Sequence, residues 1–168
     1  MSQPPVASII LCTYNRCRLL PDTLQALSRQ RLNPSVTVEV LVIDNNSTDD
    51  TKAVVERCAP QMPWPVRYVF EPVQGLSRAR NRGVQEARGT WLLFTDDDVR
   101  PSPEWAGAIL NAFERFDAAG VCGPVRPRWE AEPPSWVVRL GDGGPPALMD
   151  YGPSAFVGTL PRQKCLGA

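Results

Sequence analysis

Segments typical of β-strands alternate with segments typical of α-helices along most of this chain. The alternation predicts an α/β fold with a mostly parallel central sheet and helices on both faces, because a parallel crossover needs a helix to return the chain. Short apolar runs predict the strands, and apolar residues at helical spacing predict the helices. The expected strands are 6–11, 36–43, 66–70, 90–94 and 120–125, and the expected helices are 18–31, 50–58, 75–88 and 103–116.

Composition narrows the class of protein. The chain has 168 residues, of which 43% are hydrophobic and 21% charged, which fits one globular domain. Its 18 basic residues balance its 18 acidic residues, so no global field favours nucleic acid as a partner. No apolar run could span a bilayer, and no signal peptide is evident at the start. The five cysteines form no Cys-x-x-Cys pair, so reduced thiols and a cytoplasmic location are expected.

Three consecutive carboxylates, Asp96, Asp97 and Asp98, follow the apolar run that ends at Phe94. Like charges at a strand end repel one another, and a divalent cation relieves that repulsion. Carboxylate oxygens suit Mg²⁺ or Mn²⁺. The sequence therefore predicts a metal site here, with Asp98 and Asp96 as ligands. The alternative is that Asp98 only caps the helix that follows.

Polar residues also follow the first two expected strands. Thr13, Tyr14 and Asn15 come after the first, and Asp44 comes after the second. In a parallel sheet these positions meet at one edge, where ligands bind. A hydroxyl, an aromatic ring and an amide can contact a nucleobase, and Asp44 can accept hydrogen bonds from a ribose or base. The alternative for each group is an ordinary Asx-rich turn.

A basic group begins the third expected helix. Arg78 or Arg80 could approach a diphosphate, and the alternative is a solvated basic face. The glycine fingerprints of dinucleotide-binding folds and of P-loop proteins are absent, which argues against nicotinamide or flavin cofactors and against a P-loop NTPase. The chain has no histidine, so a His-based triad or a His-ligated zinc site within it is excluded.

Four ordered motifs together resemble the family 2 glycosyltransferases of the GT-A fold, a Rossmann-like nucleotide-diphospho-sugar transferase fold. They are residues 8–16, 40–51, 75–83 and 89–98, and the resemblance covers residues 6–125. It implies metal-dependent, inverting transfer of a sugar from a nucleotide-diphosphate donor, most often a UDP-sugar, to a saccharide, lipid or small-molecule acceptor. The implied cofactor is Mn²⁺ or Mg²⁺.

The resemblance also implies roles for individual residues. Thr13, Tyr14 and Asp44 would hold the nucleobase, and Arg78 or Arg80 would lie near base and phosphates. Asp96 would approach the ribose, and Asp98 would bind the metal. The full set of implied nucleotide-binding residues is Thr13, Tyr14, Asn15, Asp44, Arg78, Arg80, Asp96 and Asp97.

The chain departs from this family near its end. Residues 1–125 are expected to form the nucleotide-sugar-binding part, and residues 126–168 an irregular, Pro- and Trp-rich start of the acceptor side within the same domain. The catalytic base of the family lies downstream of the metal motif, so it is expected beyond Ala168. A shortened chain that binds nucleotide sugars without transferring them is therefore the alternative hypothesis. Association with the membrane surface, without a transmembrane segment, is compatible with such an enzyme.

Overall fold

The computed structural model describes residues 4–126, 128–129 and 131–132. The chain divides into two compact units, residues 1–111 and 112–168. The elements, in chain order, are β1 (Ala7–Thr13), α1 (Leu20–Ser28), β2 (Val38–Asp44), α2 (Thr51–Cys58), a short 3₁₀ helix (Ala59–Gln61), β3 (Val66–Phe70), α3 (Leu76–Glu86), β4 (Trp91–Asp96) and α4 (Trp105–Phe116).

The four described strands form one parallel sheet in the order β3-β2-β1-β4. Strands β1 and β2 are buried along their whole length, which explains why their sequences are nearly continuous apolar runs. This arrangement confirms the predicted α/β fold with a parallel sheet.

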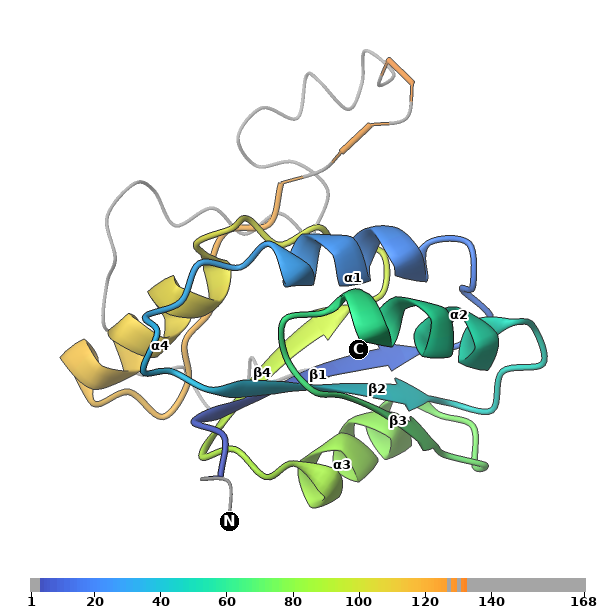
Figure 1. Cartoon of the computed structure of the whole chain (residues 1–168), viewed down its shortest axis with the longest axis horizontal. Helices are drawn as coiled ribbons and strands as arrows, with labels where there is room; N and C mark the ends of the chain where they lie inside the picture. The colour runs from blue at the N-terminus through green and yellow to red at the C-terminus, as the bar shows by residue number, and fades with distance from the viewer. Residues whose placement is uncertain (1–3, 127, 130, 133–168) are drawn as a thin grey trace, which may run out of the picture. The chain divides into compact units, whose positions relative to one another are not determined.

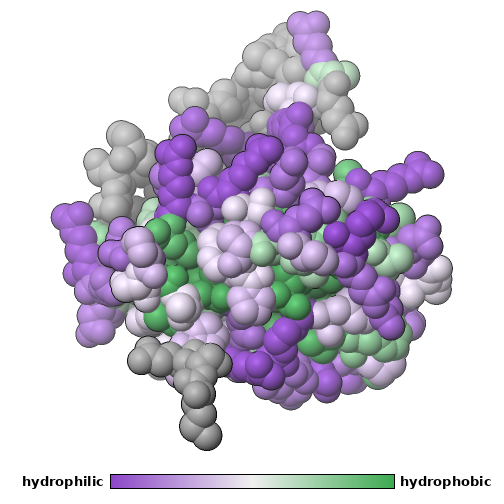
Figure 2. Space-filling model, in the orientation of Figure 1, coloured by the Kyte–Doolittle hydropathy of each residue, from purple (hydrophilic) through white to green (hydrophobic). Residues whose placement is uncertain are grey.

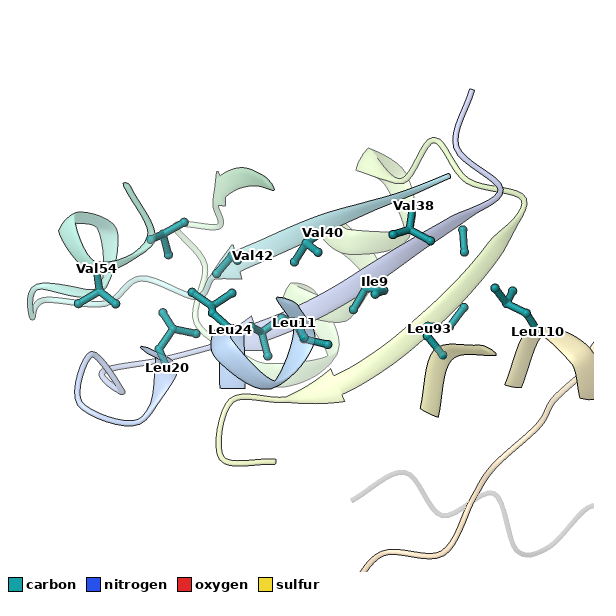
Figure 3. Close-up of a cluster of buried hydrophobic side chains, with 14 residues drawn as sticks. Ile9, Leu11, Leu20, Leu24, Val38, Val40, Val42, Val54, Leu93 and Leu110 are labelled. Carbon is teal, nitrogen blue, oxygen red and sulfur yellow. The ribbon is translucent and has the colours of Figure 1, made fainter. Parts of the chain in front are cut away.

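Helices cover both faces of the sheet (Figure 1). Side chains of α1, α2 and the first turns of α4 pack with alternate residues of β1 and β2 in the larger core, part of which is shown in Figure 3. On the opposite face Ala79 of α3 packs with Ile10, Leu41 and Ile43. In the same orientation as Figure 1, hydrophobic residues are visible at the level of the sheet, with hydrophilic residues above and below them (Figure 2).

The carboxyl ends of the strands meet at one edge because all four run in the same direction. Thr13 lies opposite Asp44 in the ladder, and Cys12 lies opposite Asp96. The polar segments that follow β1, β2 and β4 therefore begin side by side, as the sequence predicts.

The buried carboxylate of Glu39 is the centre of a hydrogen-bond and ion-pair network near the amino ends of β1 and β2. The Glu39 side chain, 4% exposed, accepts hydrogen bonds from Ser8 Oγ at 2.7 Å and the Arg88 backbone N–H at 2.8 Å, and it pairs with Arg67 at 3.2 Å. The Gly89 N–H donates to Ser8 Oγ at 2.9 Å. These bonds fix the approach of the chain to β4, away from the edge where the polar segments meet.

One expected element is wrong. Residues 120–125 do not form a strand in the structure. A strand is disfavoured here by Gly120, Gly123 and Pro124. Glycine loses more backbone entropy than other residues when it folds, and proline has no backbone N–H to donate to a neighbouring strand. Val125, which would have to pack on the core, is 58% exposed.

Most of the predicted irregular segment 126–168 lies outside the described residues, and the predicted division at residue 125 stays a prediction. Within the described part of the chain, no helix has the length and apolar character needed to cross a membrane.

Candidate functional site

A cleft of about 470 Å³ lies at the carboxyl edge of the sheet. Its volume is in the range of small-molecule and cofactor sites, ~300–1,000 Å³. Residues from the ends of β1, β2 and β4 and from the start of α3 line it: Cys12, Thr13, Tyr14, Arg16, Asn45, Gln74, Gly75, Leu76, Ala79, Arg80, Asp96, Asp97 and Asp98. The structure thus brings together six predicted residues: Thr13, Tyr14, Arg80, Asp96, Asp97 and Asp98.

The three consecutive aspartates have different environments. Asp97 is buried, and its carboxylate accepts a hydrogen bond from Thr13 Oγ1 at 2.7 Å, while its carbonyl accepts one from Thr23 Oγ1 at 2.8 Å. Burial raises the pKa of the Asp97 carboxyl, although the Thr13 hydrogen bond and the Arg16 charge oppose the rise. Asp96 and Asp98 are exposed on the cleft, which leaves their carboxylates accessible to a ligand.

The start of helix α3 also lines the cleft. Its first backbone hydrogen bond runs from the Ala79 N–H to the Gly75 carbonyl at 3.0 Å, so the amides before Ala79 lie ahead of the helical ladder. The positive end of the helix dipole therefore faces the cleft. The Arg80 guanidinium lies 3.7 Å from an Asp96 carboxylate oxygen. Arg78, the other predicted arginine, is exposed and is not part of the lining.

The burial of Cys12, at the end of β1, raises the pKa of its thiol to about 11; the Arg80 charge opposes this, and Asp96 and Asp97 add to it. The thiol is therefore protonated at neutral pH. It contributes a small, weakly polar surface to the floor of the cleft rather than a nucleophile.

Asn15 joins two loops rather than lining the cleft. Its backbone N–H donates to Ser47 Oγ at 2.9 Å, and its side-chain oxygen accepts from the Thr48 N–H at 2.8 Å. A second link runs from the Cys17 N–H to Asp49 at 3.0 Å. Asn15 adopts φ +51°, a left-handed conformation that Asn tolerates. We call these contacts the loop clasp; they hold the segment that carries Tyr14 and Arg16.

Asp44 is buried at the end of β2 and is not part of the cleft lining. One carboxylate oxygen accepts from Tyr68 Oη at 2.6 Å and the other from the Ser47 N–H at 2.9 Å. Burial raises the pKa of Tyr68, and the hydrogen bond to Asp44 raises it further. These contacts agree with the interpretation that Asp44 belongs to a turn. A contact between Asp44 and a nucleobase stays a prediction.

Several lining residues were not predicted as site residues, among them Arg16, Asn45, Gln74 and Leu76. Arg16 and Asn45 directly follow predicted residues, so the strand-end rule could have been extended to them. Gln74 and Leu76 lie in the segment that enters α3, and parallel topology brings the start of that helix to the same edge.

The capping alternative for Asp98 finds no support, because α4 begins only at Trp105. Among the described residues, no group of three or more His, Cys, Asp or Glu side chains is placed to hold a metal ion unaided. Mg²⁺ sites commonly use one or two carboxylates and complete the shell with water and substrate phosphates. The exposed carboxylates of Asp96 and Asp98 fit a cation of that kind, bound together with a phosphorylated ligand.

The sequence matches the family model described as glycosyl transferase family 2 over residues 8–148. It is also 35% identical over 132 residues to the succinoglycan biosynthesis protein ExoM of Rhizobium meliloti, an alignment that covers 79% of this chain and 42% of ExoM. The chain therefore spans less than half the length of that relative.

Solved structures give the same fold. Mannosyltransferase PcManGT from Pyrobaculum calidifontis, in complex with GDP-Man and Mn²⁺, superposes with a TM-score of 0.52 at 30% identity, over 58% of this chain and 28% of that protein. S. aureus TarS 1–349, in complex with UDP, superposes with a TM-score of 0.60 at 24% identity, over 73% of this chain and 38% of TarS. The second likeness shows the fold alone.

Proposed function

Because the chain belongs to glycosyl transferase family 2, we propose that it forms the donor-binding part of a metal-dependent, inverting glycosyltransferase. The donor is a nucleoside-diphosphate sugar, with UDP-sugars the first choice, and the acceptor is a hydroxyl of a saccharide, lipid or small molecule. The cytoplasmic location stays part of this proposal.

One observation carries the proposal. The acidic turn formed by Asp96, Asp97 and Asp98 and the positive start of α3 line the same cleft, together with Tyr14 and Thr13. A metal–diphosphate complex needs carboxylates for the cation and positive groups for the phosphate oxygens. Both sets of groups line one cleft of about 470 Å³.

The remaining lining residues suit the nucleoside. Tyr14, 44% exposed, offers a ring on which a base can stack. Arg80 is close enough to the acidic turn to balance charge on a phosphate. Asp44 remains a candidate for contact with the base, and Arg78 and Asn15 remain candidates on the strength of the family motif alone.

Asp98 and Asp96 would hold the divalent cation, and PcManGT, with its Mn²⁺, is a relative consistent with that choice. When bound, the cation would neutralise charge on the departing nucleoside diphosphate. Arg80 and the α3 amides would stabilise the same charge. The acceptor's proton needs a carboxylate base, and the family resemblance implies that this base lies downstream of the acidic turn.

Calorimetric titration of UDP and GDP, with and without Mn²⁺, tests this proposal on the chain as it stands. We expect Mn²⁺ to strengthen binding of one nucleotide, and Asp98→Ala to weaken that binding by about tenfold or more, which corresponds to ~1.4 kcal/mol. A matched control is Asp50→Ala, because Asp50 is also exposed and makes no side-chain capping bond to α2.

Equal affinity with and without the metal in the unaltered chain would contradict the metal-dependent part of the proposal. No binding of either nucleotide would contradict the donor-binding function itself. A radiolabelled-sugar transfer assay then separates an active transferase from a chain that only binds the donor.

A further inference from the structure

Asn45 is a buried polar residue that connects three segments at the cleft: the ends of β1 and β2 and the segment that enters α3. It is 5% exposed, directly follows β2, and contributes to the lining. Its backbone N–H donates to the Thr13 carbonyl at 2.9 Å, which ties it to the end of β1. Nothing in the turn pattern of the sequence distinguishes it from its neighbour Asn46.

The Asn45 side chain bonds the segment that enters α3 at two points. Its amide nitrogen donates to the Val73 carbonyl at 2.9 Å, and its amide oxygen accepts from the Gly75 N–H at 2.7 Å. Both ends of the amide are therefore satisfied, in the donor and acceptor directions that only Asn or Gln can supply. A buried amide with two such bonds fixes the separation of the segments it joins.

Gly75 is the residue through which that constraint reaches the helix. It is the N-cap of α3 and has φ +146°, a conformation that side-chain-bearing residues rarely adopt. The next residues carry the α3 amides that precede the ladder, and Arg80 lies one turn further along. The position of Gly75 therefore determines the position of these free amides in the cleft.

We infer that Asn45 is a positioning residue, which holds the start of α3 where its free amides can meet the diphosphate of the donor. This inference rests on the proposed function. Asn45 would affect binding of the phosphate end of the donor, not of the base. Asn45 would act through Gly75 rather than by contact with the donor.

The inference predicts a specific loss. Asn45→Ala removes both bonds, so the start of α3 is released and the contribution of the β-phosphate to binding falls. We expect the ratio of UDP affinity to UMP affinity, measured with Mn²⁺, to fall by about tenfold. A simple loss of folded protein lowers both affinities equally and leaves this ratio unchanged, so the ratio distinguishes positioning from stability.

A second variant perturbs the same link by another route. Gly75→Ala leaves Asn45 intact, and its Cβ would meet nothing closer than 3.9 Å, but the φ of +146° strains any residue other than glycine. We expect the same fall in the ratio. Asn33→Ala is the matched control, because the Asn33 side chain accepts its hydrogen bonds from Ser35, within its own turn.

Amide hydrogen exchange separates failure of this inference from failure of the proposed function. Faster exchange at Gly75 and in the first turn of α3 in Asn45→Ala, but not in Asn33→Ala, is expected whether or not a nucleotide binds. Unchanged exchange, or an unchanged affinity ratio in a chain that binds UDP, overturns the inference. If the unaltered chain binds neither UDP nor GDP, the proposed function fails, and altered exchange would leave Asn45 a residue that only fixes the fold.

Discussion

Replacing Gly89 with alanine tests how tightly the approach to β4 packs on β1. An added Cβ would lie 2.4 Å from the Ala7 carbonyl carbon and 2.5 Å from the Ser8 nitrogen. Ordinary contacts between carbon atoms begin at ~3.5 Å, so one of the two backbones must move by about 1 Å. Ala7 and Ser8 cannot move easily, because β1 is paired with β2 on one side and β4 on the other.

The expected cost follows from that geometry. Overpacking typically costs ~1–3 kcal/mol, and a clash with backbone rather than with a flexible side chain belongs at the upper end. For a chain of this size each kcal/mol lowers Tm by roughly 2–4 °C, so Gly89→Ala should lower Tm by about 6–12 °C. The same displacement would weaken the bond from the Gly89 N–H to Ser8 Oγ.

Differential scanning calorimetry or a circular dichroism melt measures this shift. Gly120→Ala is the control, because a Cβ there would meet nothing within 4 Å and its Tm should stay close to that of the unaltered chain. If Gly89→Ala melts within a degree or two of Gly120→Ala, the close approach of residue 89 to β1 is wrong, and with it the register by which β4 presents the acidic turn.

Three further substitutions test the buried polar contacts. Tyr68→Phe removes the hydroxyl that donates to one Asp44 oxygen, so thermal melts should show a loss of ~1–3 kcal/mol; no loss would mean that Asp44 does not depend on this contact. For Glu39, burial raises the carboxyl pKa, but hydrogen bonds and the Arg67 charge outweigh it, and the net pKa lies below the ordinary value of 4.5. The stabilisation by Glu39 is therefore full above pH 4.5 and is lost as pH falls through the lower, folded pKa. The Tm difference between the unaltered chain and Glu39→Gln should therefore shrink as pH falls below 4.5, and a constant difference would contradict the ion pair. Burial raises the pKa of Asp49, but hydrogen bonds from Thr51 and Cys17 outweigh it and lower the pKa to about 2. Asp49→Asn should cost only ~1 kcal/mol, since the site is exposed and screened, and should speed exchange of the Cys17 amide, whereas unchanged exchange would argue against the loop clasp.

The sequence by itself determined the class of fold and the edge of the sheet that carries the site. Apolar runs such as residues 38–44 can be buried on both faces only in a covered parallel sheet, and parallel strands must end at the same edge. Polar residues at the ends of those strands were therefore expected to meet, and Thr13 and Tyr14 at the end of β1 do line one cleft with Asp96, Asp97 and Asp98 at the end of β4. Asp44 at the end of β2 is not part of that lining. The same local reasoning failed at residues 120–125, where apolar residues occur without a partner strand among the described residues.

Tertiary structure alone decided which polar side chains face the cleft and which hold it together. Asn15 and Asp44 belong to the same turn-rich segments as Tyr14 and Asn45, yet the first two are engaged by neighbouring loops and by Tyr68. Tyr14 and Asn45 line the cleft, and the amide of Asn45 also binds Val73 and Gly75. The reason is that side chains in a strand-end turn can point in several directions, and hydrogen-bond partners distant in sequence determine which direction each one takes. Val73 and Gly75 make that choice for Asn45 from about thirty residues away, a distance over which no local pattern carries information.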